Sequence, residues 1–372
     1  MLQASRRWLS IFLAIFLLAS NITCLASAPE TSAAAFVLMD ADSGRILLSQ
    51  NAEQERSIAS TTKIMTCLVA LEHSTLSERV TVRREDLREG SSMYLAEGET
   101  LTMEELLYGL MLPSGNDAAE CIAAYCGGDG GSARFVGWMN EKAASLGMTH
   151  TAFANPSGLD EVGHYSCALD MARLAARAMQ DPTFARIAST RSAAVGSRTM
   201  ANHNKLLASF AGCIGGKTGY TGDAGRTLVT CAERDGLCLV AVTLRDSCDW
   251  EDHAALYDYG FSAYRRASGA RRGAQYGTVS AGDAGVPAIA AESFFYPLAE
   301  GESLSVRAEL PDTLPAPVRR GQKIGEMAIL CGGQEVGRVD LLSGCAVLPK
   351  EAQDEPVKRE SLAKKLWDML SA

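Results

Sequence analysis

The sequence has little of what marks several common classes of protein. It contains only five histidines, none with the spacing of metal ligands, so a metal centre is not expected. The 35 basic residues are outnumbered by 44 acidic ones, and the net charge of -9 gives no electrostatic surface for nucleic acid. No internal repeat is evident. With 47% hydrophobic residues in 372, the chain has enough apolar material for one large domain and a smaller one.

The start of the chain has the pattern of an export signal. Two arginines precede an apolar run over residues 8–19, which is too short to span a bilayer comfortably, and small residues follow at 26–28. We therefore predict a signal peptide at residues 1–28, cleaved after Ala28 or after Ala26. The paired arginines leave a twin-arginine signal open, and an uncleaved membrane anchor is a further alternative.

Eleven cysteines are present, and export would permit disulfides. No two of them form a Cys-x-x-Cys pair, and many lie inside apolar runs, as Cys67, Cys121 and Cys231 do. We interpret most of them as buried free thiols that act as small apolar side chains. One or two disulfides are the alternative, because sequence alone does not fix cysteine pairing.

Three short motifs stand in order along the chain: Ser-x-x-Lys at residues 60–63, Ser-x-Asn at 114–116 and Lys-Thr-Gly at 217–219. The first two would each arise by chance about once in a chain of this size, whereas the third is rarer. Their conjunction is much more specific than any one of them. Together they indicate an enzyme that acylates its own serine on a peptide with a free terminal carboxylate, or on a β-lactam.

The first motif supplies a nucleophile and a base. A serine hydroxyl attacks only when a neighbouring group takes its proton, and a lysine three residues on lies one helical turn away on the same face. Lys63 can act as that base for Ser60 only when it is neutral, which burial and a second cation such as Lys217 would favour. Ser60 at a helix start would also bring its own N–H to the oxyanion. The alternative is an ordinary helix-capping serine.

The second and third motifs supply the remaining groups. Ser114 can pass a proton between the lysines and the leaving amine, and the Asn116 amide can hold a peptide group of the substrate. Lys217 and Thr218 suit a terminal carboxylate. The other interpretations are an Asx turn for the second motif and a surface turn for the third.

The rest of the third motif concerns the substrate backbone. Gly219 would allow a substrate strand to approach closely, and Tyr220 would offer the second N–H for the oxyanion.

The pattern of apolar residues and turns predicts the order of elements. The expected elements are a hairpin at 35–49, a helix from Ser60 to Leu71, a helix with a capping box at 102–111, a helix at 117–125, a strand from Lys217, a hairpin at 226–244, a helix at 252–266, a linker at 268–273, short strands over 275–350 and a final helix at 357–372.

The chain resembles the D-alanyl-D-alanine carboxypeptidases of the low-molecular-mass, type-5 penicillin-binding protein family. The resemblance runs from about Phe36 to Phe261 and extends well beyond the three motifs. It includes the stretches at residues 59–66, 112–119, 155–159, 164–166, 202–207 and 217–221.

The resemblance implies an α/β (α+β) fold: a serine β-lactamase/transpeptidase-like domain at residues 29–267, with an antiparallel sheet flanked by helices. A small C-terminal all-β domain of β-sandwich type at 275–350 and an amphipathic helix at 357–372 would follow.

The same resemblance gives roles to the motif residues. It implies Ser60 as nucleophile, Lys63 as base and Ser114 as proton relay, with Asn116, Lys217 and Thr218 binding substrate. The family also uses an arginine for the substrate carboxylate, and Arg245 is the candidate. Asn155 and His164 match family positions, and we interpret them as shaping the loop under the site.

The expected reaction is removal of the terminal D-alanine from peptidoglycan stem peptides through an acyl-serine intermediate, with no cofactor and with covalent inhibition by β-lactams. A cross-link endopeptidase and a β-lactamase of the same fold are the alternatives, and a non-catalytic wall-binding protein is a third. The loop motif here reads Ser-Gly-Asn, whereas such β-lactamases usually carry Ser-Asp-Asn and a loop glutamate.

The last segment suits the surface of a membrane. Leu362, Leu366, Met369 and Leu370 share one helical face, and basic residues lie on its flanks. By family analogy this helix holds an exported enzyme at the outer face of the cytoplasmic membrane. A helix that docks on protein is the alternative.

Overall fold

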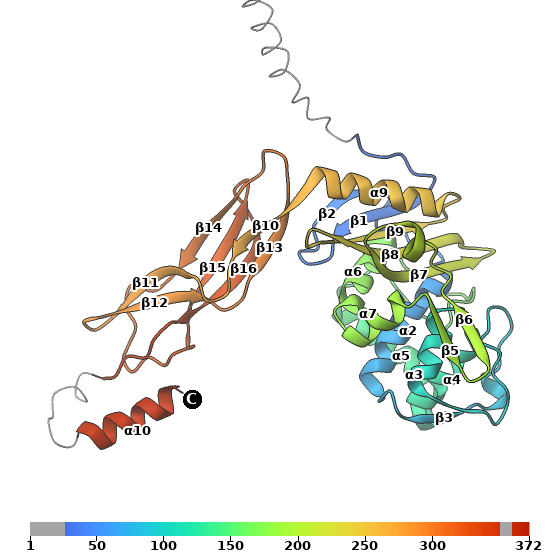
Figure 1. Cartoon of the computed structure of the whole chain (residues 1–372), viewed down its shortest axis with the longest axis horizontal. Coiled ribbons are helices and arrows are strands. Elements are labelled where there is room, and N and C mark those ends of the chain that lie inside the picture. Colours follow the sequence, from blue (N-terminus) through green and yellow to red (C-terminus); the bar gives the residue numbers. More distant parts are fainter. Residues whose placement is uncertain (1–26, 350–358, 372) are drawn as a thin grey trace, which may run out of the picture.

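The computed structural model describes residues 27–349 and 359–371, and its elements fall into two parts. The larger part combines a five-stranded sheet with helices, and the smaller is built mainly from strands (Figure 1). This is the fold class expected from the sequence. The predicted signal peptide lies outside the described residues, apart from its last two positions.

The central sheet is antiparallel, in the order β2-β1-β9-β8-β7. Alternate residues of β1 belong to different cores: Val37 and Met39 face the main helical core, whereas Phe36 and Leu38 pack on the side of helix α9. Both faces of the sheet are therefore covered. The strands are β1 (Ala35–Asp40), β2 (Ile46–Gln50), β7 (Cys213–Thr221), β8 (Gly225–Arg234) and β9 (Leu237–Leu244).

Helices cover the sheet and form a separate lobe beside it (Figure 1). They are α2 (Lys63–His73), α3 (Met103–Met111), α4 (Asn116–Gly127), α5 (Gly131–Ser145), α6 (Ala168–Met179), α7 (Pro182–Ser189), α8 (Leu206–Ser209) and α9 (Asp249–Ala263). Short elements connect them: the 3-10 helices η1 (Ala59–Thr62), η2 (Arg84–Asp86) and η3 (Gly128–Gly130), and the strand pairs β3 (Arg79–Thr81) with β4 (Thr100–Thr102) and β5 (Ser192–Val195) with β6 (Arg198–Ala201).

Local sequence signals account for several element boundaries. Thr102 Oγ1 accepts a hydrogen bond from the Glu105 N–H, and the Glu105 carboxylate accepts one from the Thr102 N–H at 2.7 Å. The predicted capping box is thus confirmed at the start of α3. The hairpins expected at 35–49 and 226–244 are confirmed as β1–β2 and β8–β9.

Three expectations for this region were wrong in detail. Lys217 lies inside β7 and does not begin it. Helix α9 starts three residues earlier than predicted and ends at Ala263. The expected linker at 268–273 was wrong because its first three residues belong to strand β10 (Tyr264–Ala270), which pairs with β13 (Phe294–Ala299).

The glycine that suggested a linker has a packing role. A Cβ on Gly269 would lie 2.8 Å from Ile329 Cγ2 and 3.2 Å from the Phe294 ring, so the strand needs glycine in order to pack closely.

The smaller part is a second core enclosed by strands. A five-stranded sheet in the order β11-β12-β16-β15-β14 and the β10–β13 pair enclose a cluster that includes Val286, Met327 and Leu341. The predicted C-terminal domain of strands is thus confirmed. Its remaining strands are β11 (Gln275–Ala281), β12 (Ala284–Ala290), β14 (Leu304–Glu309), β15 (Lys323–Cys331) and β16 (Gln334–Ser343), and helix α10 (Arg359–Ser371) follows.

Arg45, in the turn between β1 and β2, joins the two parts. Its guanidinium forms two hydrogen bonds with the Glu302 carboxylate, at 2.6 and 2.7 Å, and a third with the Pro297 carbonyl at 2.7 Å. The rings of Tyr264 and Tyr296 lie 5.3 and 5.1 Å from it. The paired carboxylate raises the pKa of Arg45. Because the planar guanidinium of Arg45 binds several partners at once, it fixes one specific contact between the two parts.

The ten cysteines of the described residues are all free thiols. Cys67, Cys121, Cys167 and Cys231 are buried, and Cys248 is exposed. The prediction of free thiols is therefore confirmed for this part of the chain, but the prediction that most of them are buried was wrong, because only four of these ten are buried.

Candidate active site

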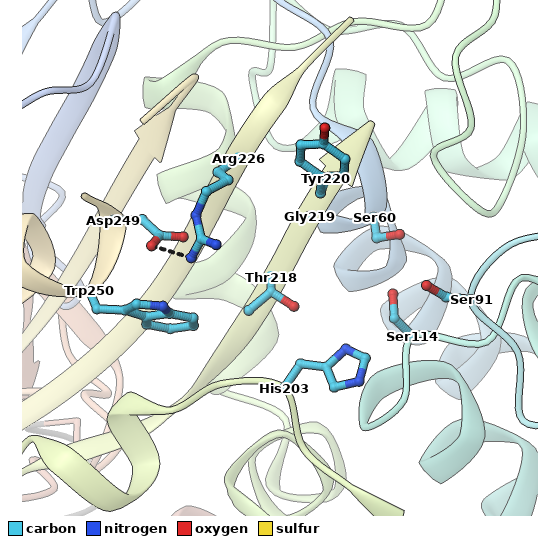
Figure 2. Close-up of a pocket in the computed structure, with 10 residues that line it drawn as sticks. All are labelled: Ser60, Ser91, Ser114, His203, Thr218, Gly219, Tyr220, Arg226, Asp249 and Trp250. Carbon is cyan, nitrogen blue, oxygen red and sulfur yellow. Dashed lines mark hydrogen bonds and ion pairs between the residues drawn. The ribbon is translucent and has the colours of Figure 1, made fainter. Parts of the chain in front are cut away.

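The three motifs meet at one cavity of about 290 Å³ in the larger part (Figure 2). Its walls come from η1, from the loops after η2 and before α4, from the segment before α8, from β7 and β8, and from the start of α9. The lining residues are Ser60, Ser91, Ser114, His203, Thr218, Gly219, Tyr220, Arg226, Asp249 and Trp250. Residues far apart in sequence thus form a single site.

Ser60 and Lys63 are positioned by the passage from η1 into α2. Lys63 is 0% exposed, and its ammonium donates hydrogen bonds to Ser60 Oγ at 2.9 Å, to Asn116 Oδ1 at 2.8 Å and to the Ser157 carbonyl at 2.5 Å. Three acceptors around one nitrogen fix its place beside the serine hydroxyl. Lys63 of the first motif is therefore in direct contact with Asn116 of the second.

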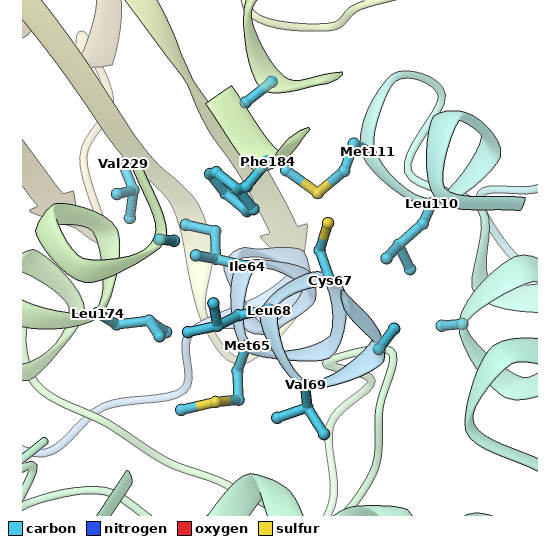
Figure 3. Close-up of a cluster of buried hydrophobic side chains, with 14 of the residues drawn as sticks. Ile64, Met65, Cys67, Leu68, Val69, Leu110, Met111, Leu174, Phe184 and Val229 are labelled. Atoms are coloured by element: carbon cyan, nitrogen blue, oxygen red, sulfur yellow. The ribbon is translucent and has the colours of Figure 1, made fainter. Parts of the chain in front are cut away.

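Helix α2 can hold this pair rigidly because it lies in the middle of the core. Its apolar side chains from Ile64 to Ala70 are at most 1% exposed. Figure 3 shows them surrounded by side chains of α3, α6, α7 and β8. A densely packed helix leaves little freedom to the residues at its first turn.

The two lysines of the site are both inside the protein. Burial, followed by the charge of Lys217, lowers the pKa of Lys63 well below the ordinary value. Burial lowers the pKa of Lys217 to about 7. Lys217 is 1% exposed and donates to the Thr218 carbonyl at 2.9 Å. A neutral lysine next to a serine hydroxyl is the condition that base catalysis requires.

Ser114 has two unusual features. Its φ angle is +66°, in the left-handed region that serine rarely adopts, and its Oγ is buried with no hydrogen-bond partner among the described residues. Buried hydroxyls normally have partners, so an unpaired one on a cavity wall indicates a group that meets a ligand. The side chain of Asn116, the last residue of this motif, is held in place because its Nδ2 donates a hydrogen bond to the Glu89 carbonyl at 2.9 Å.

The glycine of the third motif has a packing reason that the sequence did not suggest. A Cβ on Gly219 would lie 2.4 Å from Thr227 Oγ1 and 3.1 Å from the Ile58 carbonyl oxygen. The missing side chain therefore lets β7 pack against the segment that leads to Ser60. Thr218 and Tyr220 flank it on the cavity wall, and Tyr220 is 71% exposed.

The loop under the site is shaped by internal hydrogen bonds, as expected. Asn155 Oδ1 accepts from the N–H groups of Ser157 and Gly158, at 3.2 and 2.7 Å. His164 Nε2 lies 2.8 Å from Thr62 Oγ1, and burial lowers the pKa of His164 to about 4. Gly158, at φ +84°, has no room for a Cβ, which would lie 2.0 Å from the Ala59 carbonyl oxygen.

The arginine suggested by the family resemblance, Arg245, does not line this cavity. Arg245 is exposed at the end of β9 and is not among the residues that line the cavity. Arg226 of β8 is on the wall instead, and one of its guanidinium nitrogens lies 2.5 Å from Asp249 Oδ1. Its guanidinium carbon lies 5.7 Å from the centroid of the Trp250 ring. The bond to Asp249 raises the pKa of Arg226.

Two other lining residues, Ser91 and His203, were not predicted as site residues. Ser91 lies on the wall, and its carbonyl accepts a hydrogen bond from the Asn116 N–H at 2.7 Å. His203 is in one of the matched stretches, and burial, with a contribution from Lys217, lowers its pKa. Among the described residues, no three His, Cys, Asp or Glu side chains are grouped to hold a metal ion.

Comparison with known families agrees with this geometry. Residues 22–248 match the family model described as D-alanyl-D-alanine carboxypeptidase. The chain belongs to this family. Residues 270–367 match the model of the penicillin-binding protein 5 C-terminal domain. The predicted family, fold class and class of enzyme, a serine carboxypeptidase, are thereby confirmed.

Curated relatives and a solved structure extend along both parts. The D-alanyl-D-alanine carboxypeptidase DacF of Bacillus subtilis is 30% identical over 80% of this chain and 81% of its own length. DacC of Escherichia coli is 31% identical over 85% and 84%. Penicillin-binding protein 5 from Haemophilus influenzae superposes with a TM-score of 0.75 at 27% identity, over 86% of this chain and 99% of that one.

Proposed function

We propose that this member of the carboxypeptidase family removes the terminal D-alanine of a peptidoglycan stem peptide through Ser60. The observation that carries the proposal is the buried side-chain nitrogen of Lys63, which lies 2.9 Å from Ser60 Oγ and whose pKa is lowered so that its neutral form is favoured. Neutral Lys63 takes the hydroxyl proton as Ser60 Oγ attacks the carbonyl of the penultimate D-alanine. The peptide bond then breaks, D-alanine leaves with a proton, and water hydrolyses the resulting ester.

The other motif residues complete the cycle. Ser114, whose Oγ has no hydrogen-bond partner in the described part of the chain, carries the proton to the leaving amine, and the Asn116 amide orients the peptide. The N–H groups of Ser60 and Tyr220 stabilise the oxyanion.

The terminal carboxylate lies toward Lys217 and Thr218. Arg226 is the third group there, in place of Arg245, because it is the arginine on the cavity wall.

The proposal is tested by D-alanine release from a synthetic pentapeptide that ends in D-Ala-D-Ala, using the purified protein. Release that stops after penicillin treatment supports it. Rapid turnover of penicillin without release would indicate a β-lactamase. Stable penicillin labelling without release would indicate a cross-link endopeptidase, and failure of both reactions would indicate a non-catalytic wall-binding protein. The three intact motifs favour an active enzyme.

Arg226→Ala is expected to raise KM for the pentapeptide about 10- to 100-fold, the loss corresponding to a charge-assisted hydrogen bond of about 1.5–3 kcal/mol. The chemical step should be affected less, because Ser60 and Lys63 do not contact Arg226. Arg245→Ala is the matched control and should leave KM within about twofold, since its side chain lies off the wall. Steady-state kinetics of the two variants measure the difference, and the opposite ranking would return the role to Arg245.

We also propose that the enzyme is exported and held at the outer face of the cytoplasmic membrane by α10. Among the described residues no helix is long and apolar enough to cross a membrane. The exposed Trp367 and Met369 of α10 suit shallow insertion, although Leu370, predicted on the same face, is buried.

Deletion of residues 357–372 is expected to move the protein from the membrane fraction to the soluble fraction of fractionated cells. Loss of a shallow interfacial helix removes the apolar contact that holds the protein on the membrane. The full-length protein, fractionated in parallel, is the control. Its recovery in the soluble fraction would contradict the tether and leave α10 as a helix that docks on protein.

A further inference from the structure

The segment between β9 and α9 holds Arg226 at two points. Asp249 Oδ1 accepts a hydrogen bond from the guanidinium at 2.5 Å, and the Asp246 N–H donates to the Arg226 carbonyl at 3.0 Å. Trp250 lies beside the same side chain on the cavity wall (Figure 2). Both the main chain and the charged end of Arg226 are therefore set by residues 246–250.

The same segment is fastened from its other side by the first residues of the described chain. Ser32 Oγ donates to Asp246 Oδ1 at 2.5 Å, and the Ser32 N–H donates to Asp252 Oδ2 at 2.7 Å. The Cys248 N–H in turn donates to Ser32 Oγ at 3.0 Å. Ser32 thus joins Asp246 and Cys248 of the segment to Asp252 in the first turn of α9, although it lies more than 200 residues away in the sequence.

The carboxylates of Asp246 and Asp252 lie close together, and they need the hydrogen-bond donors of Ser32 to do so. Asp246 is 2% exposed and Asp252 is 8% exposed. Burial, with a smaller contribution from Asp246, raises the pKa of Asp252. Two buried acids disfavour each other's charge, and the N–H and hydroxyl of Ser32 offset this repulsion. Loss of Ser32 would loosen the segment that carries Asp249 and Trp250.

An Arg226 side chain that is already fixed loses less conformational entropy when it binds a carboxylate. A free arginine has many rotamers and loses that freedom when it meets a carboxylate, whereas a fixed guanidinium has already lost it. The side chain of Arg226 is 44% exposed, and its guanidinium is held by the Asp249 carboxylate and the Trp250 ring.

We propose that Asp249 and Ser32 are positioning residues, which hold Arg226 so that the site prefers a substrate ending in a free carboxylate. The inference rests on the proposed function, because it assumes that Arg226 meets that carboxylate. Neither residue takes part in bond making. The network therefore acts on substrate affinity and selectivity, and not on the acylation of Ser60.

The test uses Asp249→Asn and Ser32→Ala in the full protein, with Asp258→Asn as the matched control on the exposed face of α9. Two peptides are compared that differ only at the C-terminus, one with a free carboxylate and one with a carboxamide. Asp249→Asn is expected to raise KM for the acid about 10-fold and Ser32→Ala about 3-fold, with kcat within about twofold. The amide should be cleaved as by the wild type, so that the acid-to-amide selectivity falls by the same factors. Asp258→Asn should change neither.

A second readout separates this inference from the proposed peptidase reaction. The second-order rate constant for acylation, which includes the binding step, is measured for benzylpenicillin, which carries a carboxylate, and is divided by the same constant for its methyl ester. This ratio should fall in the two variants even if the wild type releases no D-alanine. The inference would be overturned if a variant lost as much activity on the amide as on the acid peptide, or as much on the methyl ester as on benzylpenicillin. It would also be overturned if these ratios did not change. Either result would mean that the network serves only packing.

Discussion

Replacing Ser60 by alanine is expected to abolish both D-alanine release and covalent labelling by penicillin. Both reactions require an oxygen nucleophile at this position. In the part of the chain that the structure describes, Ser60 is the only serine whose hydroxyl forms a hydrogen bond with the Lys63 nitrogen. Removal of the nucleophile from a serine hydrolase lowers the rate by about 10⁶-fold, which lies below detection in a labelling assay.

The loss should not be caused by unfolding. The hydroxyl of Ser60 has a hydrogen bond with Lys63, but the neighbours Ala59, Thr61 and Thr62 supply the buried contacts of η1. A substitution that removes one oxygen at a cavity wall usually changes stability by less than a change in the core. Thermal unfolding of the variant should therefore remain close to that of the wild type.

Ser57→Ala provides the matched control, because it makes the same chemical change three residues earlier and outside the cavity lining. This variant should keep both activities. The measurements are D-alanine release and labelling with a fluorescent penicillin. Labelling of Ser60→Ala that persisted on another residue would refute the assignment of the nucleophile.

The parts of the site that follow from local sequence could be predicted. A serine and a lysine three residues apart at a helix start must lie on one face, so the contact between Ser60 and Lys63 was implied by the motif alone. The capping box at Thr102 likewise fixed the start of α3. In both cases the determining interaction lies within one turn of the chain.

Local sequence could not identify Arg226 as the arginine on the cavity wall. Which residues of β8 line the cavity depends on the register of β7 with β8, where Tyr220 faces Arg226, and on the position of the segment before α9. Resemblance suggested a strand before the last helix, and Arg245 fits that description in sequence. The pairing of Arg226 with Asp249 is a contact between distant residues that no local pattern records.

The roles of Gly269 and Gly219 could not be predicted either, because they depend on contacts with residues distant in the sequence. A glycine next to serine and arginine reads as a flexible linker, whereas Gly269 is in β10 because Ile329 and Phe294 occupy the space of its side chain. Gly219 was assigned to the approach of substrate, and its missing Cβ faces Thr227 and Ile58 of the protein. Composition shows where glycine occurs, but only the fold shows what lies beside it.

The second large effect is expected for Lys63→Met, which keeps the length of the side chain and removes the base. The acylation rate should fall by about 10²–10⁴-fold, the usual contribution of a positioned general base. Lys142→Met, in α5 and away from the cavity, is the matched control and should retain activity, since it loses only an ion pair with Glu72. Stopped-flow acylation by penicillin measures both, and a Lys63→Met variant that acylated at the wild-type rate would exclude Lys63 as the base.

The wild-type pH profile provides an independent check on the two lysines. Below its lowered pKa, Lys63 is protonated and cannot accept the Ser60 proton, so kcat/KM should fall as the solution becomes more acidic. Above its pKa of about 7, Lys217 loses the charge that attracts the substrate carboxylate, so kcat/KM should fall again as pH rises. We therefore expect a bell-shaped profile for the free enzyme.

The alkaline limb can be assigned to Lys217 by comparing kcat/KM with kcat. The first reports ionisations of the free enzyme and the second those of the enzyme–substrate complex. A bound carboxylate next to Lys217 favours its charged form and raises its pKa, so the alkaline limb should move to higher pH in kcat. An alkaline limb at the same pH in both profiles would mean that the group that titrates does not meet the carboxylate, and Lys217 would lose its place in the binding site.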